Sequence, residues 1–484
     1  MLQKLSKWLQ RKIQKNIKTQ NSNADNPYQQ QVSDLLDHYK SGRFGDAQKL
    51  AVTITQEFPN HELAWNVLGV LLKRTGRLTE SLAACEKSVQ LSPKDAYAHN
   101  NLGTTLQALG RRDEAMGRYS NAIALDPDFS EAHSNFGVML AERGKLDEAR
   151  LSYIQAIALK PDNFLAHNNL GNTLKELGRL SEALVVYNQA IALRPGYAEA
   201  HSNLGQTLQA LGRIDDAEAC FIQAVSLKPD YAKAHNSLLT CFFLLNKQSL
   251  FFEKLTYLIN EGSVNSVIGS LTCRSALRYG VVKKNLFCSE PLKYVVHVDM
   301  RTRYEFEKIF VEQARLFLSD KRISNRDQSL LVNGYQTAGN LFDLGSNSIE
   351  SIEKIIRMEV EKYRIKFLDS QEGLIKKWPT EYILNGWFIS MKSGGKLKPH
   401  IHNDGWLSGS LYINIPPKTK ADSGNLVVSI GKETDSTDTR INLEKKINVV
   451  TGSLVLFPAS LMHHTIPFDS VEERIVLAFD VKPK

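Results

Sequence analysis

The sequence predicts a multidomain α+β chain in which an α-helical solenoid precedes a double-stranded β-helix, or jelly-roll, domain. In the first half, a pattern of asparagine, glycine and proline recurs every 34 residues. In the second half, short segments of alternating apolar residues replace this pattern. At 484 residues the chain has room for several domains of about 100–200 residues each. We expect a basic tail with a linker in residues 1–26, a repeat solenoid in 27–262 and a jelly-roll domain in 263–484.

The net charge of +8 arises from 60 basic and 52 acidic residues, and much of it lies at the N-terminus. Six of the positive charges precede the first acidic residue, at Lys4, Lys7, Arg11, Lys12, Lys15 and Lys18. The remaining chain therefore carries only about +2 (8 − 6), too little to indicate a basic groove across the fold. We expect no nucleic acid among the partners.

Residues 1–24 have the pattern of a basic amphipathic helix followed by a polar linker, with apolar residues such as Leu5, Trp8 and Ile13 between lysines. One interpretation is that residues 1–18 contact an anionic membrane surface, with Trp8 inserted and the lysines outside. The alternative is a helix that caps the next domain, or a frayed tail. The apolar residues are too interrupted for a secretory signal peptide.

The five cysteines are dispersed without CxxC spacing, which favours reduced thiols over a disulfide scaffold or a thiolate zinc site. The chain also lacks a run of 18 apolar residues, so we expect no transmembrane helix. Together these features predict a cytoplasmic protein, peripheral to the membrane if the tail binds lipid.

Three sequence features repeat in phase and define a helix, a turn and a second helix. Asn-Leu-Gly or a close variant ends at Gly69, Gly103, Gly137, Gly171 and Gly205. Glycine before a basic residue recurs at Gly76, Gly110, Gly144, Gly178 and Gly212, and proline at Pro93, Pro127, Pro161, Pro195 and Pro229. The second set of glycines suits the left-handed end of a first helix, and proline stops the second helix.

These five in-phase units resemble tetratricopeptide repeats. Tyr28 to Asn60 is similar to a diverged first repeat, and Asp230 to Gly262 begins in phase before losing the pattern, as expected of a cap. Because single units cannot bury their apolar faces, stacked repeats share a core and leave a concave groove.

Four asparagines occupy one position of four consecutive first helices, at Asn101, Asn135, Asn169 and Asn203. In repeats that resemble the N-terminal half of O-GlcNAc transferase, an asparagine in this context faces the groove and holds the backbone of an extended peptide. An amide can both donate to a carbonyl and accept from an N–H group. In the alternative interpretation these side chains bridge neighbouring repeats.

After about residue 265 the helical period fades, and alternating segments at Ser408 to Ile415, Val449 to Phe457 and Arg474 to Val481 predict β-strands. Four or more such strands with a histidine cluster predict a small jelly roll. Mixed helical segments precede them at residues 305–318 and 349–363.

The candidate chemistry lies in two segments of this domain. His402-x-Asp404 places an imidazole and a carboxylate at a strand end, and His463 would complete a face of two histidines and one carboxylate. Such a face holds Fe(II) with three open positions, which suit a bidentate 2-oxo acid and dioxygen. Arg474, on the last strand, could bind the distant carboxylate of 2-oxoglutarate.

From about 285 to 482 the chain resembles the Fe(II)/2-oxoglutarate-dependent oxygenases, in particular a family often fused to tetratricopeptide repeats. The similar stretches are Gln328 to Leu331, Gln336 to Phe342, His400 to Gly409 and Leu456 to Phe468. The resemblance implies Fe(II) held by His402, Asp404 and His463, and 2-oxoglutarate held by Arg474 and Tyr412.

Some positions leave alternatives open. His400 and His402 could share the metal, with Asp404 outside its ligand shell, and His464 could replace His463. Val476 stands where related oxygenases often carry a hydroxyl group.

We expect a dioxygenase that hydroxylates a protein or peptide bound in the repeat groove. The alternatives are a non-catalytic repeat scaffold with a degenerate barrel, and an oxygenase of small molecules or glycans whose repeats only mediate assembly.

Overall fold

The structure is a computed structural model that describes residues 29–320, 325–326, 330–431 and 443–484. Its contacts divide the chain into two compact units, one reaching Met139 and including Ser152–Pro161, the other comprising Leu140–Leu151 and Asp162–Lys484. The predicted basic tail, with its membrane contact, lies outside the described residues. No helix in the described ranges has the length and apolar character needed to cross a membrane.

The first unit consists of antiparallel helix pairs, as the 34-residue period predicts. The turn glycines Gly76 and Gly110 both have φ of +76°, the left-handed conformation expected at a helix end. The helices are α2 (Gln29–Lys40), α3 (Phe44–Glu57), α4 (Glu62–Arg74), α5 (Leu78–Leu91), α6 (Ala96–Ala108) and α7 (Arg112–Leu125). The next pair, α8 (Ser130–Glu142) and α9 (Leu146–Leu159), contributes residues to both units.

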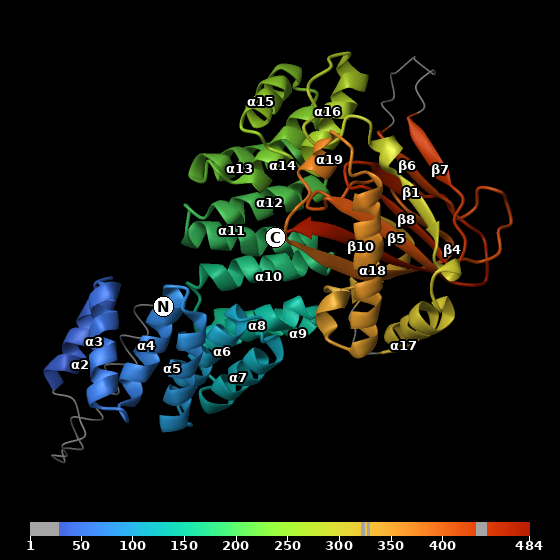
Figure 1. The fold of residues 1–484 in the computed structure, drawn as a ribbon. Helices are drawn as coiled ribbons and strands as arrows, with labels where there is room; N and C mark the ends of the chain where they lie inside the picture. Colours follow the sequence, from blue (N-terminus) through green and yellow to red (C-terminus); the bar gives the residue numbers. More distant parts are fainter. Residues whose placement is uncertain (1–28, 321–324, 327–329, 432–442) are drawn as a thin grey trace. The chain divides into compact units, whose positions relative to one another are not determined.

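The second unit begins with further pairs of the same kind (Figure 1). These are α10 (Phe164–Glu176) with α11 (Leu180–Leu193), α12 (Ala198–Ala210) with α13 (Ile214–Leu227), and α14 (Ala232–Leu244) with α15 (Gln248–Asn260). The last pair keeps the helix–turn–helix form although its sequence leaves the repeat pattern. A further helix, α16 (Ser266–Tyr279), starts where the Asn265 side chain accepts a hydrogen bond from the Ile268 amide.

Two antiparallel sheets form the rest of this unit and confirm the predicted jelly roll. The large sheet has the order β1-β8-β5-β10-β4-β3-β2 and the small sheet the order β7-β6-β9. The strands are β1 (Val296–Asp299), β2 (Asn325–Arg326), β3 (Leu331–Thr337), β4 (Tyr382–Leu397), β5 (Leu407–Asn414), β6 (Leu426–Ser429), β7 (Glu444–Ile447), β8 (Ser453–Pro458), β9 (Met462–Thr465) and β10 (Arg474–Pro483).

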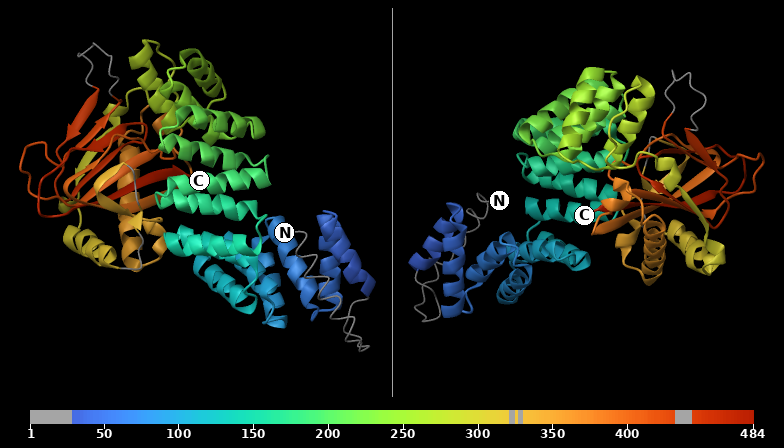
Figure 2. Two further views of the ribbon diagram at one scale, coloured as in Figure 1. Left: turned by 180° about the vertical axis from the view of Figure 1, so that it is seen from behind. Right: turned by 45° about the horizontal axis from the view of Figure 1, so that its top comes forward.

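One face of the large sheet packs against helices (Figure 2). They are the π-turn η3 (Glu307–Val311), α17 (Glu312–Ser319) and α18 (Asn347–Lys366), with short helical turns at η1 (Pro291–Tyr294), η2 (Met300–Thr302), η4 (Leu341–Leu344) and α19 (Gly373–Lys376). Phe310 and Ile356 pack there against Leu477 and Phe479 of β10. This cluster is the larger core of the unit.

The opposite face of the large sheet meets the small sheet, and β10 shows how the sequence separates the two faces. Side chains alternate along a strand. Leu477 and Phe479 enter the helix-side core, whereas Val476 joins the apolar cluster that Val428 of the small sheet completes. Arg474 and Asp480 share the face of Val476, so β10 carries one basic and one acidic residue toward the space between the sheets.

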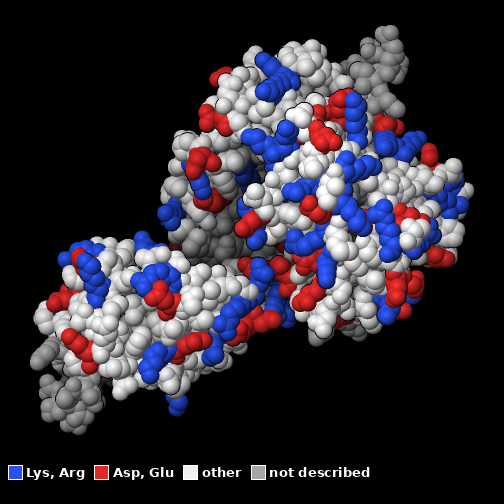
Figure 3. All heavy atoms as spheres, in the orientation of Figure 1, with Lys and Arg blue, Asp and Glu red and all other residues white. Residues whose placement is uncertain are grey.

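Charged side chains on the surface are mixed in sign. Lys and Arg are interspersed with Asp and Glu over the face shown in Figure 3. Several charged side chains of the repeats form local pairs three residues apart, such as Arg111 with Glu114 and Arg179 with Glu182.

Candidate active site

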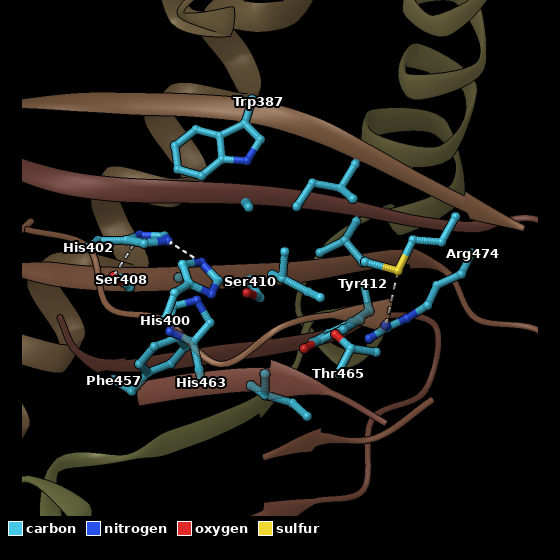
Figure 4. A pocket seen from close by; sticks show the side chains of 17 residues that line it. Trp387, His400, His402, Ser408, Ser410, Tyr412, Phe457, His463, Thr465 and Arg474 are labelled. Carbon is cyan, nitrogen blue, oxygen red and sulfur yellow. Dashed lines mark hydrogen bonds between the residues drawn. The ribbon is translucent and has the colours of Figure 1, made fainter. Parts of the chain in front are cut away.

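Three histidines come together between the sheets (Figure 4). His400 and His463 pair as an antiparallel bridge in which each backbone N–H donates to the other's carbonyl oxygen, at 3.2 and 2.9 Å. His402, two residues later, points to the same place. One ring nitrogen from each of the three lies within 4.8 Å of the others.

The hydrogen bonds of His400 and His402 fix which ring nitrogens face each other. His400 Nδ1 lies 2.9 Å from the Lys398 carbonyl oxygen, which can only accept, so this nitrogen carries the hydrogen. His402 Nδ1 lies 2.5 Å from Asp480 Oδ1. With both Nδ1 atoms protonated, the two Nε2 lone pairs face each other at 3.2 Å. A cation between them would remove this repulsion.

The environment also favours the neutral form of His400 and of His463. Burial, followed by the nearby charge of His402, lowers the pKa of His400 to about 4. Burial lowers the pKa of His463 well below its usual value, and His400 lowers it further. His463 Nδ1 is buried and has no hydrogen-bond partner among the described residues. Neutral imidazoles with free lone pairs are the form that binds a transition metal.

A buried guanidinium stands at the other end of the same pocket. Arg474 is 1% exposed, and its Nε atom has no partner in the described part of the chain. The Met391 sulfur lies 4.0 Å from Nη1, and Tyr412 lies beside the guanidinium with its ring centre 5.1 Å from Cζ. Burial lowers the pKa of Arg474 and raises that of Tyr412.

The pocket between the histidines and Arg474 is lined by Trp387, Ser410, Phe457 and Thr465, among others. Its lining residues include one arginine and no acidic residue. An anion with one carboxylate near Arg474 would offset the buried positive charge, and its other end would then reach the histidines.

The structure brings His402, His463, Arg474 and Tyr412 to one pocket, as the sequence predicts. It adds His400, the alternative ligand. Asp404 is exposed and is not part of the three-histidine group. It lies in the turn that follows His402, and it borders a different hollow. A ligand role for Asp404 therefore has no support from this geometry, and the identity of the ligands stays a prediction.

That second hollow, of about 860 Å³, lies in the same unit. We call it the repeat-side groove. Asn403 and Asp404 line one side of it with Leu331 of β3. The other side comes from the helices α10, α12, α14 and α16, through Lys175, Gln206, Gln209, Lys233, Asn236, Ser237, Thr240 and Val267.

Three of the four predicted groove asparagines bridge neighbouring repeats. Each donates to an asparagine in the preceding first helix: Asn101 to Asn66, Asn135 to Asn100 at 3.0 Å, and Asn203 to Asn168 at 3.0 Å. Asn169 accepts from the Asn168 side chain at 3.5 Å. These bonds match the structural interpretation of the ladder, and peptide binding by these four residues stays a prediction.

Two residues beside His402, Asp480 and Ser408, were not predicted from the sequence. Asp480 is 3% exposed and accepts from Ser408 Oγ at 2.8 Å as well as facing His402 Nδ1. Burial raises the pKa of Asp480, but His402 and Ser408 outweigh this effect and the net shift is downward. The alternation of β10 places Asp480 on the same face as Arg474. This spacing is the sequence feature from which its position near the pocket could have been predicted.

A residue of α16, the helix that follows the last repeat pair, also contacts the segment His402 to Asp404, which we call the metal loop. Ser266, at the start of α16 and fully buried, has its hydroxyl 3.0 Å from the His402 carbonyl oxygen and 3.2 Å from that of Asn403.

Comparisons with known families agree with this architecture. Residues 385–480 match the family described as "Putative 2OG-Fe(II) oxygenase". Tetratricopeptide repeat models match residues 35–96, 96–117, 137–178, 171–212 and 198–231. No curated protein matches the chain.

Among solved structures, PilF of Pseudomonas aeruginosa is 17% identical with a TM-score of 0.39, over 42% of this chain and 93% of that one. YrrB, described as a TPR protein with an unusual peptide-binding site, is 21% identical with a TM-score of 0.32, over 38% and 95%. MamA is 23% identical with a TM-score of 0.31, over 34% and 97%.

The fold and the pocket thus define the architecture of the chain, in which a helical repeat array is followed by a jelly roll with a histidine cluster. The chain combines tetratricopeptide repeats with a domain of the 2OG-Fe(II) oxygenase type.

Proposed function

We propose that this chain is a Fe(II)- and 2-oxoglutarate-dependent oxygenase that hydroxylates a polypeptide lying in the repeat-side groove. The observation that carries the proposal is a shared segment. His400 and His402 line the metal pocket, and the next two residues, Asn403 and Asp404, line the groove. A polypeptide on the repeats would therefore lie beside the metal loop.

The pocket residues fit the cofactor and cosubstrate. His400, His402 and His463 would hold Fe(II), because three imidazoles converge there and the Nε2 atoms of His400 and His402 face each other. Arg474 would bind the far carboxylate of 2-oxoglutarate, with the Tyr412 ring beside it. When bound, iron, 2-oxoglutarate and dioxygen insert one oxygen atom into a substrate C–H bond and the other into succinate, with release of carbon dioxide.

The groove lining suits a polypeptide backbone. Gln206, Gln209 and Asn236 present amides, which can donate and accept alternately as an extended chain requires. Lys233 is exposed in the same groove. The lining combines these groups with Leu331 and Val267, so both the backbone and an apolar side chain of a substrate find partners.

The cosubstrate part is tested by anaerobic titration of full-length protein with Fe(II) and then 2-oxoglutarate, followed by the weak visible charge-transfer band. We expect a band in the wild type and none in His402→Ala. His464→Ala is the matched control, because it removes the neighbouring histidine outside the group and should keep the band. Absence of a band in folded, iron-loaded wild type would favour a repeat scaffold without catalysis.

The substrate part is tested with a soluble library of random 12-residue peptides and mass spectrometry for a gain of one oxygen atom. Gln209→Ala combined with Asn236→Ala should lower peptide oxidation at least ~10-fold, while peptide-independent turnover of 2-oxoglutarate persists. Gln189→Ala, on the exposed face of α11, is the control. Equal oxidation by all variants would contradict the groove assignment and favour a small-molecule or glycan substrate.

A further inference from the structure

A buried carboxylate, which does not itself line the pocket, is hydrogen-bonded to one of the three pocket histidines. Asp480 lies on the inward face of β10, and its Oδ1 atom is 2.5 Å from His402 Nδ1. Ser408 Oγ donates to the same oxygen at 2.8 Å and also lies 3.3 Å from His402 Nδ1. The His402 ring is therefore held by an acid and a hydroxyl from two adjacent strands, β10 and β5, which pair Asp480 directly with Ser408.

We propose that Asp480 is a positioning residue that fixes His402 in the tautomer with Nε2 toward the metal and supplies a negative charge that the histidine side chains themselves do not provide. This inference rests on the proposed function, because it concerns the same metal centre.

The pairing of Asp480 supports this role. Among the described residues its ion-pair partner within 4.0 Å is His402, and Lys482, further along β10, acts on it only through its charge. A carboxylate buried to this extent needs a cationic partner to balance its desolvation. A metal-bound imidazole provides one, since the cation draws electron density from the ring and strengthens the Nδ1–H bond to the acid.

Asp404 is the other acidic residue of this region and provides the contrast. It is two residues from His402 in sequence, yet it is exposed and belongs to the repeat-side groove. The sequence predicts that the Asp404 carboxylate binds the metal directly. In this geometry the carboxylate beside the histidines is that of Asp480, which would act through His402.

The test uses full-length protein under anaerobic conditions, with Co(II) and Fe(II) as probes and calorimetry as the readout, and needs no substrate. Asp480→Ala should weaken metal binding by about 10–100-fold, the usual effect of removing such a partner. Asp480→Asn, which keeps the shape but not the charge, should give a smaller loss. Asp404→Asn is the matched control and should bind metal as the wild type does.

A second readout does not depend on any variant folding. In metal-free wild type labelled with ¹⁵N-histidine, the His402 signals should show Nδ1 protonated and Nε2 bare. The opposite tautomer would overturn the inference. So would unchanged metal affinity in a folded Asp480→Ala protein together with a loss in Asp404→Asn. If the wild type binds neither metal, the proposed function fails, while the tautomer still reports whether Asp480 orients the ring.

Discussion

Arg474 is a buried cation in the pocket, and its burial carries a free-energy cost that no carboxylate among its described contacts offsets. A guanidinium withdrawn from water normally lies beside a carboxylate, because an unpaired buried charge costs several kilocalories per mole. Here the side chain is buried and faces a tyrosine ring and a thioether sulfur instead. This arrangement is explained if the partner is a ligand carboxylate, which compensates the charge only when bound.

This argument predicts opposite effects of Arg474→Met on stability and on binding. Removing the unpaired charge should raise the free energy of unfolding of the ligand-free protein by about 1 kcal/mol or more. The same change should weaken 2-oxoglutarate binding at least ~10-fold in calorimetric titrations. Arg301→Met is the control, because Arg301 pairs with exposed Asp299 on the surface and should alter both quantities little. Loss of stability in Arg474→Met would show that the guanidinium has a structural role.

At this scale the sequence predicts four pocket residues: the order of the motifs points to His402, His463 and Arg474, and the resemblance to the oxygenases adds Tyr412. It does not separate His400 from Asp404. That choice depends on the backbone bridge between His400 and His463, which joins segments 63 residues apart (463 − 400). Asp480 was missed for the same reason, since its contact with His402 crosses between strands.

The repeat helices show why one glycine of each unit recurs although its backbone is ordinary helix. A Cβ atom on Gly103 would lie 2.8 Å from Cε1 of Tyr119, a fully buried ring of the paired helix. Gly137, Gly171 and Gly205 face Tyr153, Tyr187 and Phe221 in the same manner. The motif Asn-Leu-Gly therefore encodes close helix packing, whereas Gly76 and Gly110 encode the turn.

Two glycines of adjacent helices should respond to alanine with opposite signs. Gly103→Ala forces the Tyr119 ring to move, although its hydroxyl is held by Gln107 at 2.8 Å, and should cost about 1–3 kcal/mol. Gly117→Ala, on exposed α7 surface with open space around it, should stabilise by roughly 0.5–1 kcal/mol. Urea unfolding followed by circular dichroism measures both. A shift of the same sign in both variants would contradict the packing argument.

The elements themselves were largely predictable. The 34-residue period predicts the helix pairs, and alternation predicts β5, β8 and β10. The small sheet was not predicted strand by strand, because β6, β7 and β9 are four residues each and β9 carries two adjacent histidines instead of an apolar alternation. Its existence depends on pairing with β6, a contact between distant segments.

At the scale of the molecule, the helix that directly follows the repeats contacts the metal loop. Within the unit that includes Asp162–Lys484, the Ser266 hydroxyl holds the carbonyls that follow His402. The helix that begins at Ser266 directly succeeds the last repeat pair. The conformation of the segment bearing His402 therefore depends on a residue of the helix that follows the repeats, which lies at the start of the jelly-roll domain predicted from the sequence at 263–484.

The contact between Ser266 and the metal loop gives a prediction that can be tested by comparing two serines of α16. Ser266→Ala removes the buried hydroxyl that donates to the carbonyl oxygen of His402 or of Asn403, so it should destabilise the protein by about 1–3 kcal/mol and weaken Co(II) binding several-fold. Ser270→Ala is the matched control: Ser270 is equally buried, but its hydroxyl has no partner among the described residues, so its loss should be neutral or stabilising. Thermal unfolding and calorimetric metal titration measure both. If Ser266→Ala lowers stability but leaves metal affinity unchanged, the Ser266 contact has a structural role only, and the metal loop keeps its conformation without this contact.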